Sequence, residues 1–375
     1  MRSKRLMALL ITGAACMGMA VSGCGNQINE NAVFATLDDT TITMGVANFF
    51  AKYEQASYDS YYLAYFGEDM WNNDLYGSGN TMAHDVKEDV AERLQTMYLL
   101  KAHMDEYKIS ISEEEEAKIA KAADDFIAAN SADAIKQVGA ENKENVMEML
   151  RLYTIQEKMH NRIKEDADVE VTDEEAAQRT FSYVTISTAA HTDEDSNTVE
   201  YTEEEKADLK KKAEDIAAAE DFDTAVTDGG YTTSTASYGS AEDEDASFDK
   251  AVLEAADALK EGEVSPVIET ESAYYVLRLD SEHDEEASAS KKESLISEKE
   301  EAYYDDIVSG WKEKATWTIN EKEWEKVTFE DRFAQIADDT ESPSEEITNT
   351  EGTEEIIDAA EDTEAADGTE AAETK

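Results

Sequence analysis

FDKAVLEAADALKEGEVSPVIETESAYYVLRL, residues 248–279, is the stretch that decides the fold of this chain. Its first part is an apolar segment that predicts a helix. Gly262 and Pro266 then mark a turn between residues 260 and 266. Val267–Glu269 and Tyr274–Leu279 follow as two short runs that predict β-strands. The order of a helix, a turn and two strands indicates a small α+β unit.

The other half of such a unit lies upstream. Phe181–Ile186 predicts a first strand and Thr202–Ala219 a first helix, followed by Asp221-Phe-Asp-Thr-Ala225. With the stretch at 248–279, this order resembles a parvulin-type peptidyl-prolyl isomerase domain. The resemblance covers roughly residues 178–282 and implies a domain over residues 178–286, with a small antiparallel sheet and helices.

The residues of the expected active site depart from the family pattern. Parvulins usually carry a His in the first strand and another in the last, and Tyr183 and Tyr275 stand at the aligned positions. Of the usual glycine-rich pattern, the segment 228–240 keeps only the glycines. The resemblance therefore implies Tyr183 and Tyr275 as catalytic positions and weak isomerase activity or none.

Four further residues are expected to line the substrate site: Phe248, Leu253, Tyr274 and Tyr238. Core packing is the alternative role for all of these side chains. Rotation about a peptide bond faces a barrier of about 18–20 kcal/mol. An isomerase lowers it by binding the twisted amide more tightly than the planar forms. Such a site needs an apolar slot and no nucleophile, so no cofactor is expected.

The first residues predict export and a lipid anchor. Three basic residues precede the apolar segment Leu6–Ala20, which is short for a membrane span. Val21-Ser-Gly-Cys24 then resembles a bacterial lipobox. Residues 1–23 are expected to be a lipoprotein signal peptide and Cys24 the lipidated residue, with a linker over 24–31. An ordinary secretory peptide or a transmembrane anchor is the alternative. The mature chain is expected on the outer face of a cell membrane.

Composition narrows the possible partners. The formal net charge is −56, and loss of the three basic residues before Cys24 would take it to −59. Such a surface repels phosphate backbones, which excludes nucleic acid as a partner. Cys16 lies in the segment to be cleaved and Cys24 would carry lipid, so no disulfide is expected.

Helical patterns fill the region before the parvulin-like domain. They run over residues 43–66, 82–107, 112–130 and 143–166, and Ser112, Thr172 and Thr202 begin capping boxes. After the domain, 291–315 predicts a long helix, with short β runs at Trp317–Ile319 and Val327–Phe329. This arrangement resembles PrsA-type foldase lipoproteins. It implies an N-terminal chaperone domain over 32–176 that packs with 288–335.

An aromatic run near the start of that region is a second candidate surface. Ten of the 31 aromatic residues fall between Phe49 and Tyr76. The face from Tyr58 to Tyr65, with Trp71, could hold apolar segments of unfolded proteins, and core or local packing is the favoured alternative.

The remaining parts of the chain do not predict a catalytic or metal-binding site. The tail over 338–375 has 15 acidic residues and one Lys, which predicts disorder. Residues 193–204 place oxygens at some positions of an EF-hand count, but Thr198 replaces the needed Gly and a solvated loop is favoured. The five histidines show no ligand spacing, so no metal is expected.

The predicted protein is an extracytoplasmic folding factor for newly exported, unfolded proteins, with a peptidyl-prolyl isomerase domain. A non-catalytic holdase chaperone with a decayed parvulin domain, or a surface lipoprotein that binds a ligand or wall component, are the alternatives. The oligomeric state stays open, with a dimer as one option.

Overall fold

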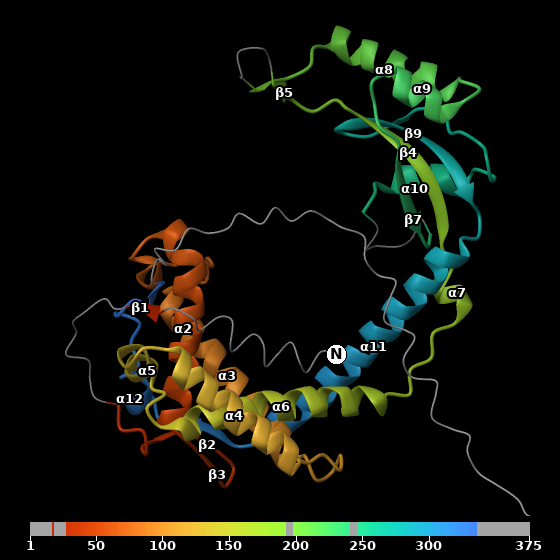
Figure 1. Ribbon diagram of the computed structural model, residues 1–375. Coiled ribbons are helices and arrows are strands. Elements are labelled where there is room, and N and C mark those ends of the chain that lie inside the picture. The colour runs from red at the N-terminus through yellow and green to blue at the C-terminus, as the bar shows by residue number, and fades with distance from the viewer. Residues whose placement is uncertain (1–16, 19–27, 193–197, 241–246, 336–375) are drawn as a thin grey trace, which may run out of the picture. The chain divides into compact units, whose positions relative to one another are not determined.

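The structure is a computed structural model that describes residues 17–18, 28–192, 198–240 and 247–335 (Figure 1). Cys24, most of the expected signal peptide, residues 193–197 of the loop with the EF-hand count and the acidic tail lie outside these residues. The described residues form the predicted α+β fold, in which helices predominate and the sheets are small and antiparallel. No helix among them combines the length and hydropathy that a membrane crossing requires.

Helices make up most of the chain before residue 177. In order they are α2 (Met44–Phe66), η1 (Met70–Asn72), α3 (Met82–Ala102), α4 (Glu113–Ala129), α5 (Ala132–Val138), α6 (Lys143–Glu165) and α7 (Asp173–Ala176).

The last part of the chain returns to these helices. Its elements are α11 (Glu285–Lys314), β10 (Trp317–Ile319), α12 (Glu321–Trp324) and β11 (Ala334–Gln335). β10 pairs with β2 (Val33–Leu37), which also pairs with β3 (Thr40–Thr43), and all pairs are antiparallel. β11 pairs in the same sense with β1 (Met17–Gly18).

The predicted capping boxes begin three helices. Ser112, Thr172 and Thr202 each accept a hydrogen bond from the backbone of the glutamate three residues later, whose carboxylate bonds back to the cap residue. Each box satisfies backbone N–H groups that a helix start would otherwise leave unpaired. These three helix starts are therefore predictable from the local sequence alone.

One hydrophobic core joins the first helices to the end of the described chain. Phe34 of β2 lies 4.7 Å from Trp324 between ring centroids, and Trp71 lies 4.5 Å from Phe329. Val327 and Phe333 are buried in the same core. A second cluster packs α11 against α3 and α6 through Leu100, Ile155, Met159, Ile163, Tyr304 and Val308.

One predicted strand in this region is wrong, and one predicted helix is too long. Val327–Phe329 pairs with no described strand; it runs as an extended segment whose first and third side chains enter the core. The helix predicted to reach Tyr107 ends at Ala102, and turns follow up to Lys108, which has a φ of 55°. In this turn segment the backbone N–H groups of Glu106, Tyr107 and Lys108 donate to carbonyls three residues back, not four, so the α-helix does not continue.

The segment between α7 and α11 contains a four-stranded antiparallel sheet. Its strand order is β7 (Ser234–Tyr238), β4 (Arg179–Ser187), β9 (Ala273–Ser281) and β8 (Ile268–Glu269). The helices on this sheet are α8 (Glu203–Ala217), α9 (Phe222–Asp228) and α10 (Lys250–Asp257), and β5 (His191–Thr192) pairs with β6 (Thr198–Val199) beside it. The two long strands predicted from the sequence, β4 and β9, are paired along their length.

Each face of this sheet has its own core. Val184, Tyr274 and Val276 pack with residues of α8 and α9. Phe181, Leu277 and Leu279 pack on the opposite face with Val252, Leu253 and Ala256 of α10. Because side chains alternate along a strand, each long strand contributes to both cores.

The turn before β8 is tied to β9 by backbone hydrogen bonds. Gly262, with a φ of 83°, donates to the carbonyl of Leu279 at 2.7 Å. Ser265 donates its N–H to the Leu277 carbonyl at 2.8 Å, and its hydroxyl accepts from the Leu277 N–H at 2.9 Å. These hydrogen bonds therefore hold the turn at residues 260–266 in register with β9.

Candidate functional site

Three aromatic rings meet on the α10 side of the sheet. Tyr183 of β4 and Tyr275 of β9 lie with ring centroids 6.4 Å apart. Phe248, two residues before α10, stands edge-on to both, at 5.1 Å from Tyr183 and 6.5 Å from Tyr275. All three are partly buried on the edge of the core of this face. We call Tyr183, Phe248 and Tyr275 the aromatic trio.

Buried side chains support the aromatic trio from below. Phe181 is fully buried beneath it, with its ring 5.3 Å from Phe248 and 5.5 Å from Tyr238. The Tyr238 hydroxyl donates to Asp257 Oδ1 at 2.8 Å, and burial together with this bond raises the pKa of Tyr238. A fixed layer of rings below leaves the trio little freedom to move inward.

The arrangement suits an apolar ring beside a carbonyl. Partly exposed aromatic faces bind apolar groups, and the phenol of a tyrosine can donate to a carbonyl oxygen. Among the described residues, Tyr183 and Tyr275 share a ring contact and no mutual hydrogen bond. The trio thus has the character of a binding surface rather than of a proton relay.

The remaining sequence-predicted site residues have different places. Leu253 is 1% exposed and Tyr238 5%, so both lie within the core that supports the trio. Tyr274 is not brought to the trio: it lies on the opposite face of the sheet with α8 and α9, where Lys210 stands 5.9 Å above its ring. The prediction that Tyr274 lines the same site as Tyr275 is therefore corrected, because neighbours in a strand point to opposite faces.

The family match falls on this part of the chain. Residues 188–289 match the model of the PPIC-type PPIase domain. The chain carries a parvulin-type domain. The sequence-based recognition of this domain is thereby confirmed. The match begins just after β4, whose hydrogen bonds to β7 and β9 make it an inner strand of the parvulin-type sheet.

Solved structures of bacterial chaperones are similar to longer parts of the chain. A structure reported for the SurA-like chaperones PEB4 and Cj1289 of Campylobacter jejuni is 12% identical, with 77% of this chain and 99% of that chain covered and a TM-score of 0.29. The foldase protein PrsA from Streptococcus pneumoniae is 18% identical over 68% of this chain and 98% of its own, with a TM-score of 0.30. PrsA from Bacillus cereus is 18% identical over 69% and 97%, with a TM-score of 0.29. No curated protein sequence matches the chain.

A second candidate surface lies outside the parvulin-type domain, at the C-terminal end of α2. Five aromatic side chains are exposed there, and two of them, Tyr61 at 69% and Tyr65 at 83%, are mostly in solvent. We call this set the α2 aromatic face, and its members are Tyr61, Tyr62, Tyr65, Phe66 and Tyr76.

Trp71 does not belong to this surface, contrary to the prediction from the aromatic run. It is 1% exposed, and its Nε1–H donates to the buried carboxylate of Asp59 at 2.7 Å. Asp59 also accepts from the Phe333 N–H at 2.8 Å. Trp71 therefore belongs to the core, where a partner some 260 residues later in the chain covers it.

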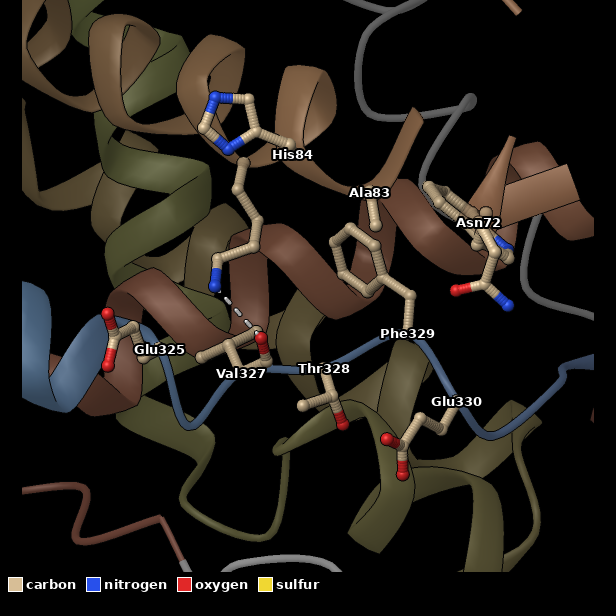
Figure 2. Close-up of a pocket in the computed structure, with 10 residues that line it drawn as sticks. Asn72, Ala83, His84, Glu325, Val327, Thr328, Phe329 and Glu330 are labelled. Atoms are coloured by element: carbon tan, nitrogen blue, oxygen red, sulfur yellow. Dashed lines mark hydrogen bonds between the residues drawn. The ribbon is translucent and has the colours of Figure 1, made fainter. Parts of the chain in front are cut away.

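A pocket of about 340 Å³ is lined in part by Trp71 and other residues of the core. Ala83, Val327 and Phe329 are among its lining residues, and Figure 2 shows Glu325 and Glu330 at the two ends of the segment that carries the Phe329 ring. The amine of Lys87 donates to the carbonyls of Trp324 and Val327, and burial lowers the pKa of Lys87. Sequence analysis missed this pocket because its walls come from distant segments.

His84, His103 and His160 each contact aromatic or acidic side chains. His103 stacks on Trp311 at 4.0 Å, and His160 bonds to Glu301 at 3.0 Å. His84 lies with Asp85 and Glu88 in an exposed group whose potential ligand atoms are within 4.8 Å of one another. These three residues could hold a metal ion, but Asp85 already accepts a hydrogen bond from Ser78 and His84 pairs with Glu88. Nothing else at this group points to an ion.

Proposed function

We propose that this protein is an extracytoplasmic folding factor whose parvulin-type domain binds X-Pro segments of exported proteins and isomerises them weakly. The match to the PPIC-type PPIase domain carries this proposal. The aromatic trio supports it, since three half-buried rings on a fixed sheet face offer an apolar seat for a proline ring.

The proposed mechanism is differential binding. A twisted prolyl amide loses the resonance that makes the planar amide polar, so a poorly hydrated aromatic surface favours the twisted form. The rings of Tyr183, Phe248 and Tyr275 would hold the pyrrolidine ring, and a phenol would donate to the substrate carbonyl. The usual histidine pair is replaced by tyrosines, and for this reason the proposed activity is weak.

The proposed organisation is a composite domain with an insert. Residues 32–176 and 288–335 would form the chaperone domain, and 178–286 the parvulin-type domain. In support, one core includes both Phe34 and Trp324, and a second includes both Ile163 and Val308.

The proposed location is the outer face of a cell membrane. It rests on the lipobox-like sequence that ends at Cys24 and on the basic and apolar segments before it. Two acyl chains on a lipidated Cys24 would anchor the protein stably, whereas one chain alone holds only marginally.

A holdase function is the second candidate, and the α2 aromatic face favours it. Five exposed aromatic side chains close together in sequence are unusual on a soluble surface and suit transient binding of apolar segments. This function does not depend on the trio.

The test measures both functions on the same preparation of the full chain. Cis–trans exchange of a proline tetrapeptide reports the isomerase, and aggregation of a denatured model protein reports the holdase. Catalysed exchange that is lost in Phe248→Ala supports the isomerase. Suppressed aggregation without catalysed exchange favours the holdase alone, and failure of both assays overturns the proposal.

A further inference from the structure

Three rings of the α2 aromatic face contact one another and connect to the buried core. Tyr62 lies 6.5 Å from Tyr61 and 6.1 Å from Phe66 between ring centroids. Tyr58 joins them to the core, at 5.7 Å from Tyr62 and 5.8 Å from the buried Trp71. A hydrogen bond with Tyr76, together with burial, raises the pKa of Tyr58 and links the loop after η1 to the helix. These contacts preorganise Tyr61, Tyr62, Phe66 and Tyr76, whereas Tyr65 extends into solvent beside them.

The stretch of sequence that carries this surface has charge of one sign. From Glu54 to Met82 the chain has five acidic residues and no basic one, and these are Glu54, Asp59, Glu68, Asp69 and Asp74. Glu68 and Asp69 are exposed immediately after α2, next in sequence to Phe66 and Gly67. Carboxylates beside exposed rings raise the local concentration of cations.

Three basic side chains near this region are already engaged, and one of them, Arg332, donates to the backbone carbonyl of Glu68. Lys52 donates to the carbonyl of Thr328 and to Gln55. Arg93 pairs with Glu54 and Asp89. The cation–π contacts within the described ranges all use rings outside the α2 aromatic face, namely Phe329, Trp324, Tyr98, Tyr274 and Phe222. The chain thus places open ring faces near carboxylates, and no cation of the described residues lies over these rings.

We propose that the α2 aromatic face binds unfolded polypeptide segments in which Lys or Arg stands next to apolar residues. This proposal rests on the holdase function and names the class of segment that it takes. The apolar residues would cover the rings, and each cation would lie over a ring face or beside the carboxylates of Glu68 and Asp69. Both interactions with the cation weaken as salt screens them, whereas the apolar contact does not.

The charge argues against a membrane surface as the occupant. An anionic lipid headgroup would be repelled by the same carboxylates that attract a basic segment. The proposal is therefore a peptide site, and binding to anionic vesicles is an outcome that would contradict it.

The experiment compares three fluorescent peptides by anisotropy with the full chain. All three have the same apolar residues, and the two variable positions hold Lys, Ser or Glu. We expect the Lys peptide to bind most tightly and the Glu peptide least, and we expect the preference for Lys to shrink between 50 and 500 mM salt, about the range over which the Debye length falls severalfold.

Variants assign the binding to this surface. Tyr62→Ser, Tyr65→Ser and Phe66→Ser combined should weaken the Lys peptide by at least about tenfold, since each exposed cation–π contact is worth roughly a factor of two to five. Tyr303→Ser on α11, which also removes an exposed tyrosine, is the control and should change binding less than about twofold.

A second pair of variants isolates the charge. Glu68→Gln with Asp69→Asn should weaken the Lys peptide by about two- to tenfold, as for exposed ion pairs, and leave the Ser peptide unchanged. Glu293→Gln with Glu313→Gln removes two exposed carboxylates from α11 and is the matched control. Because all these positions are exposed, the variants are expected to fold, and circular dichroism checks this.

The possible outcomes separate this proposal from the holdase function. Equal binding of the three peptides, lost in the triple aromatic variant, would keep the holdase site and overturn the preference for cations. Binding of none of the peptides, with no suppression of aggregation, would overturn the holdase function as well. Binding to phosphatidylglycerol vesicles that the triple variant abolishes would assign the surface to the membrane instead.

Discussion

The ring of Phe248 stands at 88° to the ring of Tyr183, with 5.1 Å between their centroids. This edge-on contact joins the start of α10 to the inner strand β4. Phe248 therefore covers one side of the aromatic trio, and all three rings remain partly exposed. If the trio is the proline site, Phe248 is the side chain whose removal opens it most.

Phe248→Ala is expected to lower the isomerisation rate of a proline peptide by at least about tenfold, because loss of a large aromatic contact costs 1.4 kcal/mol or more. The measurement is the exchange rate at equal protein concentration. Leu253→Ala is the contrasting change. It removes a fully buried side chain and should lower the free energy of unfolding by about 2–5 kcal/mol. An unaltered rate in Phe248→Ala would remove the trio from the mechanism.

Tyr183 is expected to act through its ring more than through its hydroxyl. Tyr183→Phe should keep the exchange rate within about threefold of the wild type, whereas Tyr183→Ala should lose it, since differential binding to an apolar surface needs no proton transfer. Tyr231→Phe, at a partly buried tyrosine on the other face of the sheet, is the control. A loss in Tyr183→Phe equal to that in Tyr183→Ala would assign the phenol an essential role.

The same substitution, Gly to Ala, is expected to have opposite effects on stability at Gly262 and Gly310. A Cβ at either position meets no other atom within 4 Å, but Gly262 has a φ of 83° and Gly310 lies inside α11. Gly262→Ala should destabilise the protein by about 1–2 kcal/mol because of its left-handed backbone. Gly310→Ala should stabilise it by about 0.5–1 kcal/mol. Denaturant unfolding followed by circular dichroism measures both, and a stabilising Gly262→Ala would contradict the turn geometry.

Asp59 is expected to hold the end of the described chain on α2. Asp59→Ala would leave the buried N–H groups of Trp71 and Phe333 without their acceptor, which should cost about 2–4 kcal/mol. Limited proteolysis should then cut earlier near residues 327–335. Asp69→Ala, at an exposed carboxylate, should change stability by less than about 0.5 kcal/mol. Equal effects of the two changes would show that these hydrogen bonds contribute little.

The capping carboxylate Glu175 gives an expected pH dependence. Hydrogen bonds from the Thr172 backbone N–H and from Lys299 and the Thr172 hydroxyl lower its pKa from 4.5 to about 2. Because the unfolded chain takes up the proton first, the stabilisation is present above pH 4.5 and is lost as pH falls towards 2.

Glu175→Gln should therefore show a shallower loss of stability over that range than the wild type. Urea midpoints measured between pH 2 and 5 test this, with the exposed neighbour Glu174→Gln as the control. If the urea midpoint depends on pH in the same way in the wild type and in Glu175→Gln, the capping carboxylate does not contribute to the loss of stability in acid.

Local signals in the sequence predicted much of the fold. The three capping boxes and the pairing of β4 with β9 depend on nearby residues or on strong strand patterns, and all are found. The short helix α5 was missed, although Ser131 caps it, because seven residues carry too little periodicity.

The errors in the candidate sites have tertiary causes. Tyr274 and Tyr275 were assigned to one surface, but strand alternation sends them to opposite cores. Trp71 looked exposed because its cover, Phe329 and Phe333, comes from the far end of the chain. Spacing along one segment could not reveal either arrangement.

The most direct test of the central claim is two-dimensional proton exchange spectroscopy on a tetrapeptide with one X-Pro bond. With a small amount of the full chain, the account predicts cis–trans exchange faster than in the peptide alone. It also predicts that Phe248→Ala abolishes this effect and Tyr231→Phe keeps it. Exchange no faster than in the peptide alone, or equal acceleration by the wild type and Phe248→Ala, would contradict the claim that the aromatic trio is a prolyl isomerase site.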